Sequence, residues 1–376
     1  MTPQRTAWLD PSPWPDGRWA TPADVERALG CEEPGPRELA VLLSPAAHSF
    51  IEVMAQRARA LTQRHFGRTI SLYTPLYLAN YCTNGCAYCG FASDRAQPRR
   101  RLEPPELEKE LTVLKELGFQ EVLLLTGERT THADFNYLLE CVSLAARRFH
   151  GVVIEVFPMT TREYALLAEA GCSGVTIYQE TYDLRQYDRL HRWGPKKEYL
   201  DRLEAPSRAM EAGMRTVGLG VLLGLSDPVS DAVCLLRHVG HLQRIHWKSG
   251  ITLSFPRLRP QAGNYQAEFP VDEAWLARLV FAFRIVLPDV PLLLSTRERS
   301  EFRDGMAGIG ISKMSAGSRT TVGGYGGAEP ATEGQFQVSD KRSVPEICAM
   351  LRNRGLAPVF KNWDSVFRDA EAGGHG

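Results

Sequence analysis

The sequence has no excess of charge of either sign, since 44 Lys and Arg residues balance 44 Asp and Glu residues among 376. We therefore expect neither nucleic acid nor a membrane surface as a partner, because both attract basic proteins. The N-terminus lacks the apolar core of a signal peptide, and no apolar run approaches the length of a membrane span. The eight cysteines form no regular pairs. This argues against a secreted disulfide scaffold and favours a reduced, cytoplasmic location.

Three of the cysteines are closely spaced. Cys82, Cys86 and Cys89 form a C-x3-C-x2-C pattern just after the apolar run 70–78. Thiolates suit zinc, copper(I) and iron–sulfur clusters. A structural zinc ion would need a fourth ligand, yet the other cysteines are scattered singly, at positions 31, 141, 172, 234 and 348. Three thiolates can instead hold a [4Fe–4S] cluster and leave one iron open for a small molecule. Zinc remains the alternative.

From Thr69 onward, eight short apolar runs alternate with stretches that have the periodicity of amphipathic helices. The runs are 70–78, 121–125, 152–157, 175–178, 217–225, 251–255, 292–295 and 311–315, and the main helical stretches are 105–117, 134–149, 162–170, 197–212, 230–247 and 273–286. Eight strands separated by helices predict an α/β fold with a parallel sheet, and eight is the number that closes a (β/α)8 TIM-type barrel. A doubly wound open sheet is the alternative.

Segments at both ends extend this core. Residues 1–68 are predicted to form a helical extension with helices over 23–29 and 46–66, because Thr21-Pro22 and Ser44-Pro45 are typical helix starts. Residues 69–320 would form the barrel. Residues 321–376 would form a capping segment with one short helix over 344–354. The glycine-rich stretch 316–327 lacks the Lys-Ser/Thr of a phosphate-binding P-loop, so we interpret it as a capping loop.

Polar residues stand at the predicted strand ends, where barrels of this type carry their sites. Gly127-Glu128 follows the second run and could bind an ammonium group, although such a pair is often only a turn. Glu155 lies within the third run, where a carboxylate is costly unless it meets a cation or points into a polar lumen. Glu180 ends the fourth run. Gly220, in the fifth, marks a place where a ligand could approach the backbone closely.

Three arginines follow the sixth and seventh runs. Arg257 and Arg259 come after the sixth, and Arg297 after the seventh. The planar guanidinium is well matched to a carboxylate, so these residues predict a substrate carboxylate near this rim. Salt bridges to Glu155, Glu180 or Glu298 are an equally open interpretation.

The cysteine pattern, with Tyr88 before its last cysteine and Gly90-Phe91 after it, resembles the radical S-adenosylmethionine (SAM) superfamily. Longer motifs resemble one family within it, the 2-iminoacetate synthases. These are Pro75-Leu76-Tyr77-Leu78, Tyr178-Gln179-Glu180-Thr181-Tyr182, Ser254-Phe255-Pro256-Arg257-Leu258-Arg259-Pro260 and Leu294-Ser295-Thr296-Arg297-Glu298. The resemblance implies a lyase of thiamine thiazole biosynthesis. Such an enzyme splits SAM into methionine and a 5′-deoxyadenosyl radical, and cleaves L-tyrosine between Cα and Cβ into 2-iminoacetate and p-cresol.

The strand-end residues and this resemblance together assign roles. Cys82, Cys86 and Cys89 would hold the [4Fe–4S] cluster. The predicted SAM contacts are Tyr88, Gly127, Glu128, Glu155, Gln179, Glu180, Arg202 and Gly220. The predicted tyrosine contacts are Tyr77, Arg257, Arg259 and Arg297, and the predicted catalytic residues are Arg297, Glu298 and Ser295.

The resemblance also implies protein partners. Thiazole synthase would accept the 2-iminoacetate, and a reduced flavodoxin- or ferredoxin-type protein would donate the electron. One rival is the hydrogenase-maturation tyrosine lyase, whose second cysteine cluster we do not expect, because Cys348 is the only cysteine after Cys234. A biotin-synthase-like sulfur insertion would need further cysteines at strand ends. A zinc-stabilised binding module without enzymatic activity is the rival from outside the enzymes.

Overall fold

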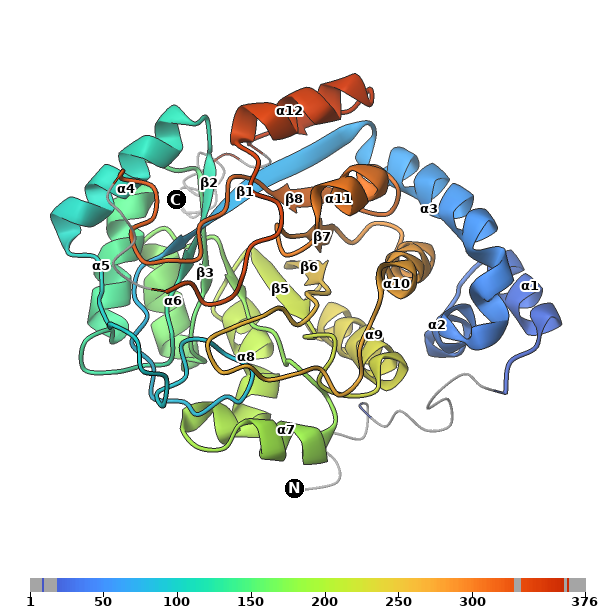
Figure 1. The fold of residues 1–376 in the computed structure, drawn as a ribbon, viewed down its shortest axis with the longest axis horizontal. Helices are drawn as coiled ribbons and strands as arrows, with labels where there is room; N and C mark the ends of the chain where they lie inside the picture. Colours follow the sequence, from blue (N-terminus) through green and yellow to red (C-terminus); the bar gives the residue numbers. More distant parts are fainter. Residues whose placement is uncertain (1–8, 10–18, 328–332, 362–363, 365–376) are drawn as a thin grey trace, which may run out of the picture.

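Eight parallel strands close into a barrel in the computed structural model, which describes residues 9, 19–327, 333–361 and 364. Each strand pairs in parallel with the next along the chain, and β1 (Thr69–Tyr77) pairs with both β2 (Glu121–Leu125) and β8 (Lys313–Ser315) (Figure 1). The predicted (β/α)8 barrel is therefore confirmed, and the open doubly wound sheet is excluded. A ninth short strand, β9 (Ala357–Val359), was not predicted and pairs with the first three residues of β1.

The remaining barrel strands lie at the predicted runs, shifted by one residue at most of their starts. They are β3 (Gly151–Glu155), β4 (Gly174–Thr176), β5 (Thr216–Gly220), β6 (Gly250–Ser254) and β7 (Leu292–Leu294). The helices between them are α4 (Pro104–Glu116), α5 (Phe135–Ala146), α6 (Thr161–Glu169), α7 (Leu184–Leu190), α8 (Tyr199–Glu211), α9 (Pro228–Ile245), α10 (Glu273–Val286) and α11 (Ser300–Met306), with α12 (Val344–Asn353) near the end of the chain. Of these, α7 and α11 were not predicted.

The N-terminal extension packs on the barrel helices. It consists of α1 (Pro22–Gly30), α2 (Pro36–Leu43), the 3-10 helix η2 (Pro45–Phe50) and α3 (Ile51–Phe66). Thr21 caps α1 as predicted, since its hydroxyl accepts a hydrogen bond from the Asp24 amide. α2 and α3 contact α10, and one hydrophobic core runs through the extension and the barrel. The predicted domain boundaries at 68/69 and 320/321 stay predictions.

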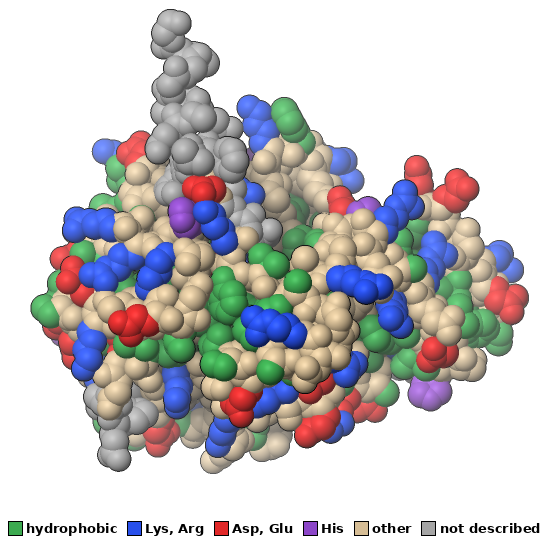
Figure 2. All heavy atoms as spheres, turned by 90° about the horizontal axis from the view of Figure 1, so that it is seen from above, with side chains coloured by type: hydrophobic (Ala, Val, Ile, Leu, Met, Phe, Trp, Pro, Cys, Tyr) green, Lys and Arg blue, Asp and Glu red, His purple; other side chains and the backbone are tan. Residues whose placement is uncertain are grey.

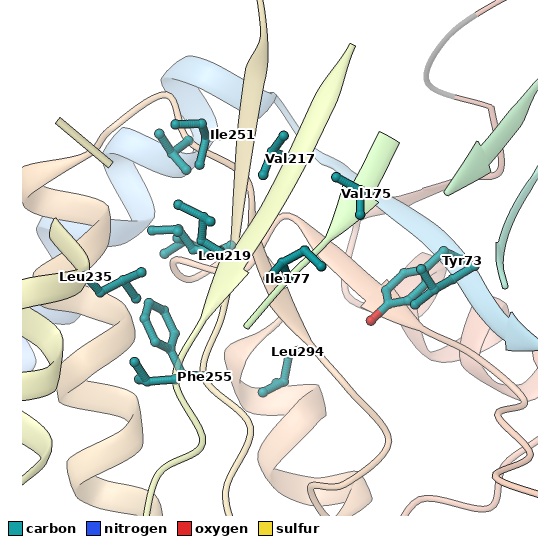
Figure 3. Close-up of a cluster of buried hydrophobic side chains, with 14 of the residues drawn as sticks. Tyr73, Val175, Ile177, Val217, Leu219, Leu235, Ile251, Phe255 and Leu294 are labelled. Carbon is teal, nitrogen blue, oxygen red and sulfur yellow. The ribbon is translucent and has the colours of Figure 1, made fainter. Parts of the chain in front are cut away.

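Strand residues alternate between the barrel wall and its lumen, as the two-residue period of a strand requires. Outward-facing apolar residues meet the surrounding helices: Leu219 and Phe255 gather near Leu235 of α9, whereas Tyr73 of β1 lies apart from this group (Figure 3). Many inward-facing residues are small or polar, including Ser71, Thr176, Thr216, Gly218, Thr252 and Lys313. The lumen therefore is not filled by layers of branched apolar side chains, as it is in many barrels.

A cavity of about 540 Å³ opens at the N-terminal end of the barrel as a result. Tyr73, Leu123 and Tyr178 line both this cavity and a second one at the C-terminal end of the strands. These three residues thus form the floor of this second cavity, which we call the upper cavity. Of the predicted site residues, Tyr77, Glu155, Ser295 and Arg297 line it.

The surface shown in Figure 2 carries Lys and Arg side chains interspersed with Asp and Glu, as the balanced totals require. Among the described residues, no single helix has the length and apolar composition needed to cross a membrane. One pair of helices, Pro36–Leu43 with Pro45–Phe66, has the required length and apolar composition when the two are taken together, but the pair is bent by 79°.

Candidate active site

The three closely spaced cysteines lie on the loop that follows the C-terminal end of β1, which we call the cysteine loop. Cys86 is buried, and Cys82 and Cys89 are half-buried. Arg99 holds this loop in shape, because its guanidinium donates hydrogen bonds to the carbonyls of Asn80 (2.7 Å) and Phe91 (2.8 Å), and also to those of Ala92 and Arg95. The half-buried guanidinium of Arg99 therefore joins the residues that precede the cysteines to those that follow them.

The thiols fit an iron–sulfur cluster better than a single metal ion. Among the described residues, no group of three or more His, Cys, Asp or Glu side chains is placed to hold one ion, which argues against a closed zinc site. Burial raises the pKa of Cys82 to about 11 and also raises that of Cys86, so a metal cation would stabilise the thiolate form of both. Backbone amides point at the sulfurs, from Glu128 to Cys82 and from Phe91 to Cys89, both at 3.4 Å. Such donors are typical of cluster sites.

Gly127 and Glu128 lie directly against this loop. A Cβ atom at Gly127 would stand 2.3 Å from the Tyr81 carbonyl oxygen and 2.8 Å from the Cys82 Cβ, so only glycine fits there. Glu128 is buried, and its Oε2 accepts a hydrogen bond from Asn84 Nδ2 at 2.9 Å. The loop after β2 thus places a carboxylate beside the cysteines, where it can accept hydrogen bonds from an ammonium group.

Glu180 and Arg202 belong to a buried charged group above β4. Lys196 Nζ lies 2.6 Å from Glu180 Oε1, and Arg202 Nη2 lies 3.6 Å from the same oxygen. Burial alone would raise the pKa of Glu180, but Lys196 and Arg202 outweigh it and leave that pKa below its ordinary value. Glu180 has a φ of 72°, which is uncommon outside glycine and is characteristic of functional sites.

Glu155 and Gln179 complete this side of the rim. Burial, with the nearby negative charge of Glu180, raises the pKa of Glu155 to about 7. Gln179 is 3% exposed, and its Nε2 is a buried donor without a hydrogen-bond partner among the described residues. A buried donor left unpaired is costly and points to a ligand that accepts from it. At Gly220 the space of a Cβ atom is taken up by the Ser254 carbonyl and the ring of Tyr178.

Tyr88 is held by a buried histidine. Its hydroxyl lies 2.6 Å from His191 Nε2, and His191 Nδ1 lies 2.8 Å from the Tyr187 carbonyl oxygen. Because a carbonyl can only accept, Nδ1 carries the proton and Nε2 accepts from Tyr88. Burial lowers the pKa of His191 well below its usual value, which keeps the ring neutral.

Two of the three rim arginines are paired with a carboxylate of the protein. Arg257 Nε lies 3.0 Å from Glu298 Oε1, and Arg259 Nη2 lies 2.7 Å from Glu298 Oε2. Arg257 also donates to the Val271 carbonyl at 2.9 Å. The sequence left two interpretations open for these arginines, a substrate carboxylate or a salt bridge within the protein. For Arg257 and Arg259 the structure contains the salt bridge. Glu298, which is 2% exposed, is likewise held by two cations rather than free at the cavity.

Arg297 is different. Among the described residues it has no carboxylate within ion-pairing distance, and its guanidinium stacks 3.4 Å from the centre of the Phe336 ring. It lines the upper cavity together with Tyr77, Glu155 and Ser295. Hence this arginine, alone among the three, offers its charge to a ligand in the cavity.

A segment that was not predicted to contribute to the site covers this cavity. Residues 333–340, which we call the strap, hydrogen-bond to the loops after β6, β7 and β8 through Pro260, Thr296 and Thr320. Figure 1 draws this segment as the orange-red coil that crosses the barrel. Gln335 and Phe336 of the strap line the cavity. Neither they nor Lys196 and His191 lie in a sequence pattern that would have indicated a role.

Family models match most of the chain. Residues 76–232 match the Radical SAM superfamily, and residues 254–357 match the Biotin and Thiamin Synthesis associated domain. The chain is 40% identical over 346 residues to the 2-iminoacetate synthase of Escherichia coli (strain K12), covering 92% of both chains. The same values hold for the 2-iminoacetate synthase of Salmonella typhimurium (strain LT2). The 3-methylornithine synthase of Methanosarcina barkeri (strain Fusaro) is 29% identical over 203 residues, 53% of this chain and 57% of that protein.

Solved structures show the same architecture. HydG, described as a maturase of the [FeFe]-hydrogenase, superposes with a TM-score of 0.86 at 32% identity, covering 99% of this chain and 84% of that one. Methylornithine synthase (PylB) superposes with a TM-score of 0.73 at 20% identity, covering 92% of this chain and 99% of that one, and supports the fold alone.

Proposed function

Because the chain belongs to the 2-iminoacetate synthases, a family of radical SAM enzymes that use a [4Fe–4S] cluster and SAM, we propose that it cleaves L-tyrosine between Cα and Cβ. The products would be 2-iminoacetate and p-cresol, with methionine and 5′-deoxyadenosine from SAM. The observation that carries this proposal is Arg297, which has no ionic partner among the described residues and lines the upper cavity together with Gln335, whose side chain reaches Cys89. It supplies the one charge that an amino-acid carboxylate requires.

When bound, the cluster and SAM supply the 5′-deoxyadenosyl radical, and the protein supplies position and exclusion of water. In this proposal Cys82, Cys86 and Cys89 hold the cluster. Glu128 would accept hydrogen bonds from the ammonium group of SAM, because its backbone amide donates to Cys82 Sγ and its carboxylate accepts from Asn84 on the cysteine loop. Arg202 would meet the SAM carboxylate, since its Nε donates to the Tyr178 carbonyl at 2.7 Å and thereby aims the rest of the guanidinium.

The other SAM contacts in this proposal follow from buried polar groups. Gln179 would use its unpaired Nε2 as a donor to SAM. Tyr88, oriented by His191, would present its ring to the adenine. Glu155 and Glu180 would accept hydrogen bonds from the ribose hydroxyls, and Gly220 would serve SAM indirectly, by letting the Ser254 carbonyl and the Tyr178 ring pack closely on the same side of the rim.

For tyrosine, Arg297 would bind the carboxylate, and Ser295 and Tyr77 would line the same pocket. Arg257, Arg259 and Glu298 would act indirectly, because their mutual salt bridges fix the loops after β6 and β7 that carry this pocket. We thus assign them to positioning rather than to direct contact with tyrosine.

Protein partners follow from the chemistry of the product and of the cluster. 2-Iminoacetate hydrolyses readily, so we propose transfer to thiazole synthase. A reduced flavodoxin- or ferredoxin-type protein would supply the electron. An oxygen-sensitive cluster also favours a reducing, cytoplasmic setting.

The test is an anaerobic assay of the reconstituted chain with tyrosine, SAM and dithionite, followed by chromatography for p-cresol and 5′-deoxyadenosine. We expect both products to accumulate together, and neither to form with Cys86→Ala. SAM cleavage without p-cresol, at saturating tyrosine, would contradict the proposed substrate. Carbon monoxide or cyanide among the products would favour the hydrogenase-maturation activity instead.

A further inference from the structure

Gln335 of the strap lies between the cysteine loop and the upper cavity. Its backbone amide donates to the Thr320 carbonyl at 3.1 Å, in the loop after β8. Its carbonyl oxygen lies 2.6 Å from the position that a Cβ atom on Gly90 would occupy. Gly90 follows Cys89 directly, so the absence of a side chain there lets the strap close down on the cysteine loop.

The side chain of Gln335 bridges a cysteine and a residue of the cavity. Its Oε1 accepts a hydrogen bond from the Tyr77 hydroxyl at 2.8 Å. Its Nε2 lies 3.8 Å from Cys89 Sγ, within the range of a hydrogen bond to sulfur. Tyr77 is 3% exposed and packs edge-on against Phe91 at 5.7 Å between ring centres, so its hydroxyl is well fixed.

The chemistry of these partners settles the orientation of the amide. A thiolate ligand can only accept, so the Nε2 side of Gln335 must face Cys89. The Oε1 side then faces Tyr77, whose hydroxyl becomes the donor. Tyr77 in this way holds the amide in the orientation that directs an N–H group at the sulfur.

Hydrogen bonds to cluster sulfurs help to set the reduction potential of a cluster. Reduction adds negative charge that is shared with the cysteine ligands, so a donor at a ligand favours the reduced state. We propose that Gln335 is a positioning residue that raises the potential of the cluster by donating from Nε2 to Cys89, in an orientation held by its hydrogen bond from Tyr77. This inference rests on the proposed function, because it requires a redox-active cluster on Cys89.

The experiment is a redox titration of the reconstituted full chain, with the reduced cluster followed by electron paramagnetic resonance in the presence of SAM. Gln335→Met keeps the approximate volume and removes the donor. Gln335→Glu keeps the acceptor for Tyr77 and removes the donor when ionised. Gln337→Met is the matched control, because Gln337 is an exposed residue of the same strap.

We expect the equilibrium constant for reduction to fall about fivefold in both Gln335 variants, which is about 40 mV more negative for a one-electron couple. Gln337→Met should keep the wild-type potential. Iron content and thermal unfolding should match the wild type in all three variants, since the change is to one side chain at the site. A purely structural role would alter cluster content but not the potential of the cluster that remains.

Wild-type potentials in both Gln335 variants would overturn the proposal. Loss of the cluster from both, with normal content in Gln337→Met, would also overturn it and make Gln335 a structural residue. Failure of the proposed function is distinguishable: a wild-type chain that holds a reducible cluster but yields no p-cresol would reject tyrosine cleavage, and the potentials of the variants would still decide the role of Gln335.

Discussion

Replacing Arg297 with Gln should separate tyrosine binding from SAM cleavage. Arg297 is the one rim arginine without an ionic partner among the described residues, and it contacts the Phe336 ring at 3.4 Å. The substitution therefore leaves no protein carboxylate unpaired. It removes only the cation that we assign to the tyrosine carboxylate, so the fold, the cluster and the SAM contacts should stay intact.

The size of the effect follows from what the substrate would lose. A buried charge-assisted pair costs about 2–5 kcal/mol when one partner is removed, mostly because the other charge stays buried and unpaired. The apparent affinity for tyrosine should fall by a factor of roughly 30 to several thousand. SAM should still be split, so 5′-deoxyadenosine should accumulate faster than p-cresol.

The assay is an anaerobic time course at several tyrosine concentrations, with both products measured by chromatography. Arg259→Gln is the matched control, because Arg259 lies on the same rim but is paired with Glu298. We expect it to raise the tyrosine requirement much less than Arg297→Gln does, because Arg257 still holds Glu298. Arg202→Gln should instead reduce both products together, through weaker SAM binding. Coupled products with unchanged tyrosine dependence in Arg297→Gln would refute the assignment of the carboxylate.

Three further predictions address the cluster and the lumen. Cys86→Ala should abolish the iron–sulfur absorbance, whereas Cys141→Ala should retain it; the reverse result would show that the ligands are wrongly assigned. Gly127→Ala should lower the iron content per chain, because its Cβ would clash with the cysteine loop, while Gly305→Ala, with open space around it, should not. The pKa of Glu155, about 7 against an ordinary 4.5, means that the folded chain retains a proton which the unfolded chain releases. Stability of the iron-free chain should therefore fall as pH rises from about 4.5 to about 7, and Glu155→Gln should reduce this fall in urea unfolding; equal slopes in both proteins would contradict the raised pKa.

The fold could be predicted from the sequence where local pattern decides the structure. Strand β2 and helix α10 begin and end at the predicted residues, because the residues that flank each of them interrupt its sequence pattern. β9 was missed because three residues that include Pro358 carry no strand pattern, and only β1 beside them makes them a strand. α11 was missed because a helix of seven residues is too short to show a clear helical periodicity in the sequence.

The site was predictable only in part for a similar reason. The spacing of Cys82, Cys86 and Cys89 placed them on one loop, since they are neighbours in sequence. The pairing of Arg257 with Glu298 joins residues 41 positions apart, and the sequence left it as one of two interpretations. Gln335 lies 246 residues from Cys89, so nothing local could have indicated their contact.

The hydrogen bonds from Arg99 to the cysteine loop have a consequence for the order of assembly. Ordering a loop of this length costs roughly 1–2 kcal/mol of conformational entropy per residue. In this structure four carbonyls of the loop converge on the guanidinium of Arg99, and none of these hydrogen bonds involves a cysteine side chain. The protein itself therefore bears part of the cost of ordering the loop. Iron and sulfide would have correspondingly less disorder to remove from this loop when a cluster is assembled on it.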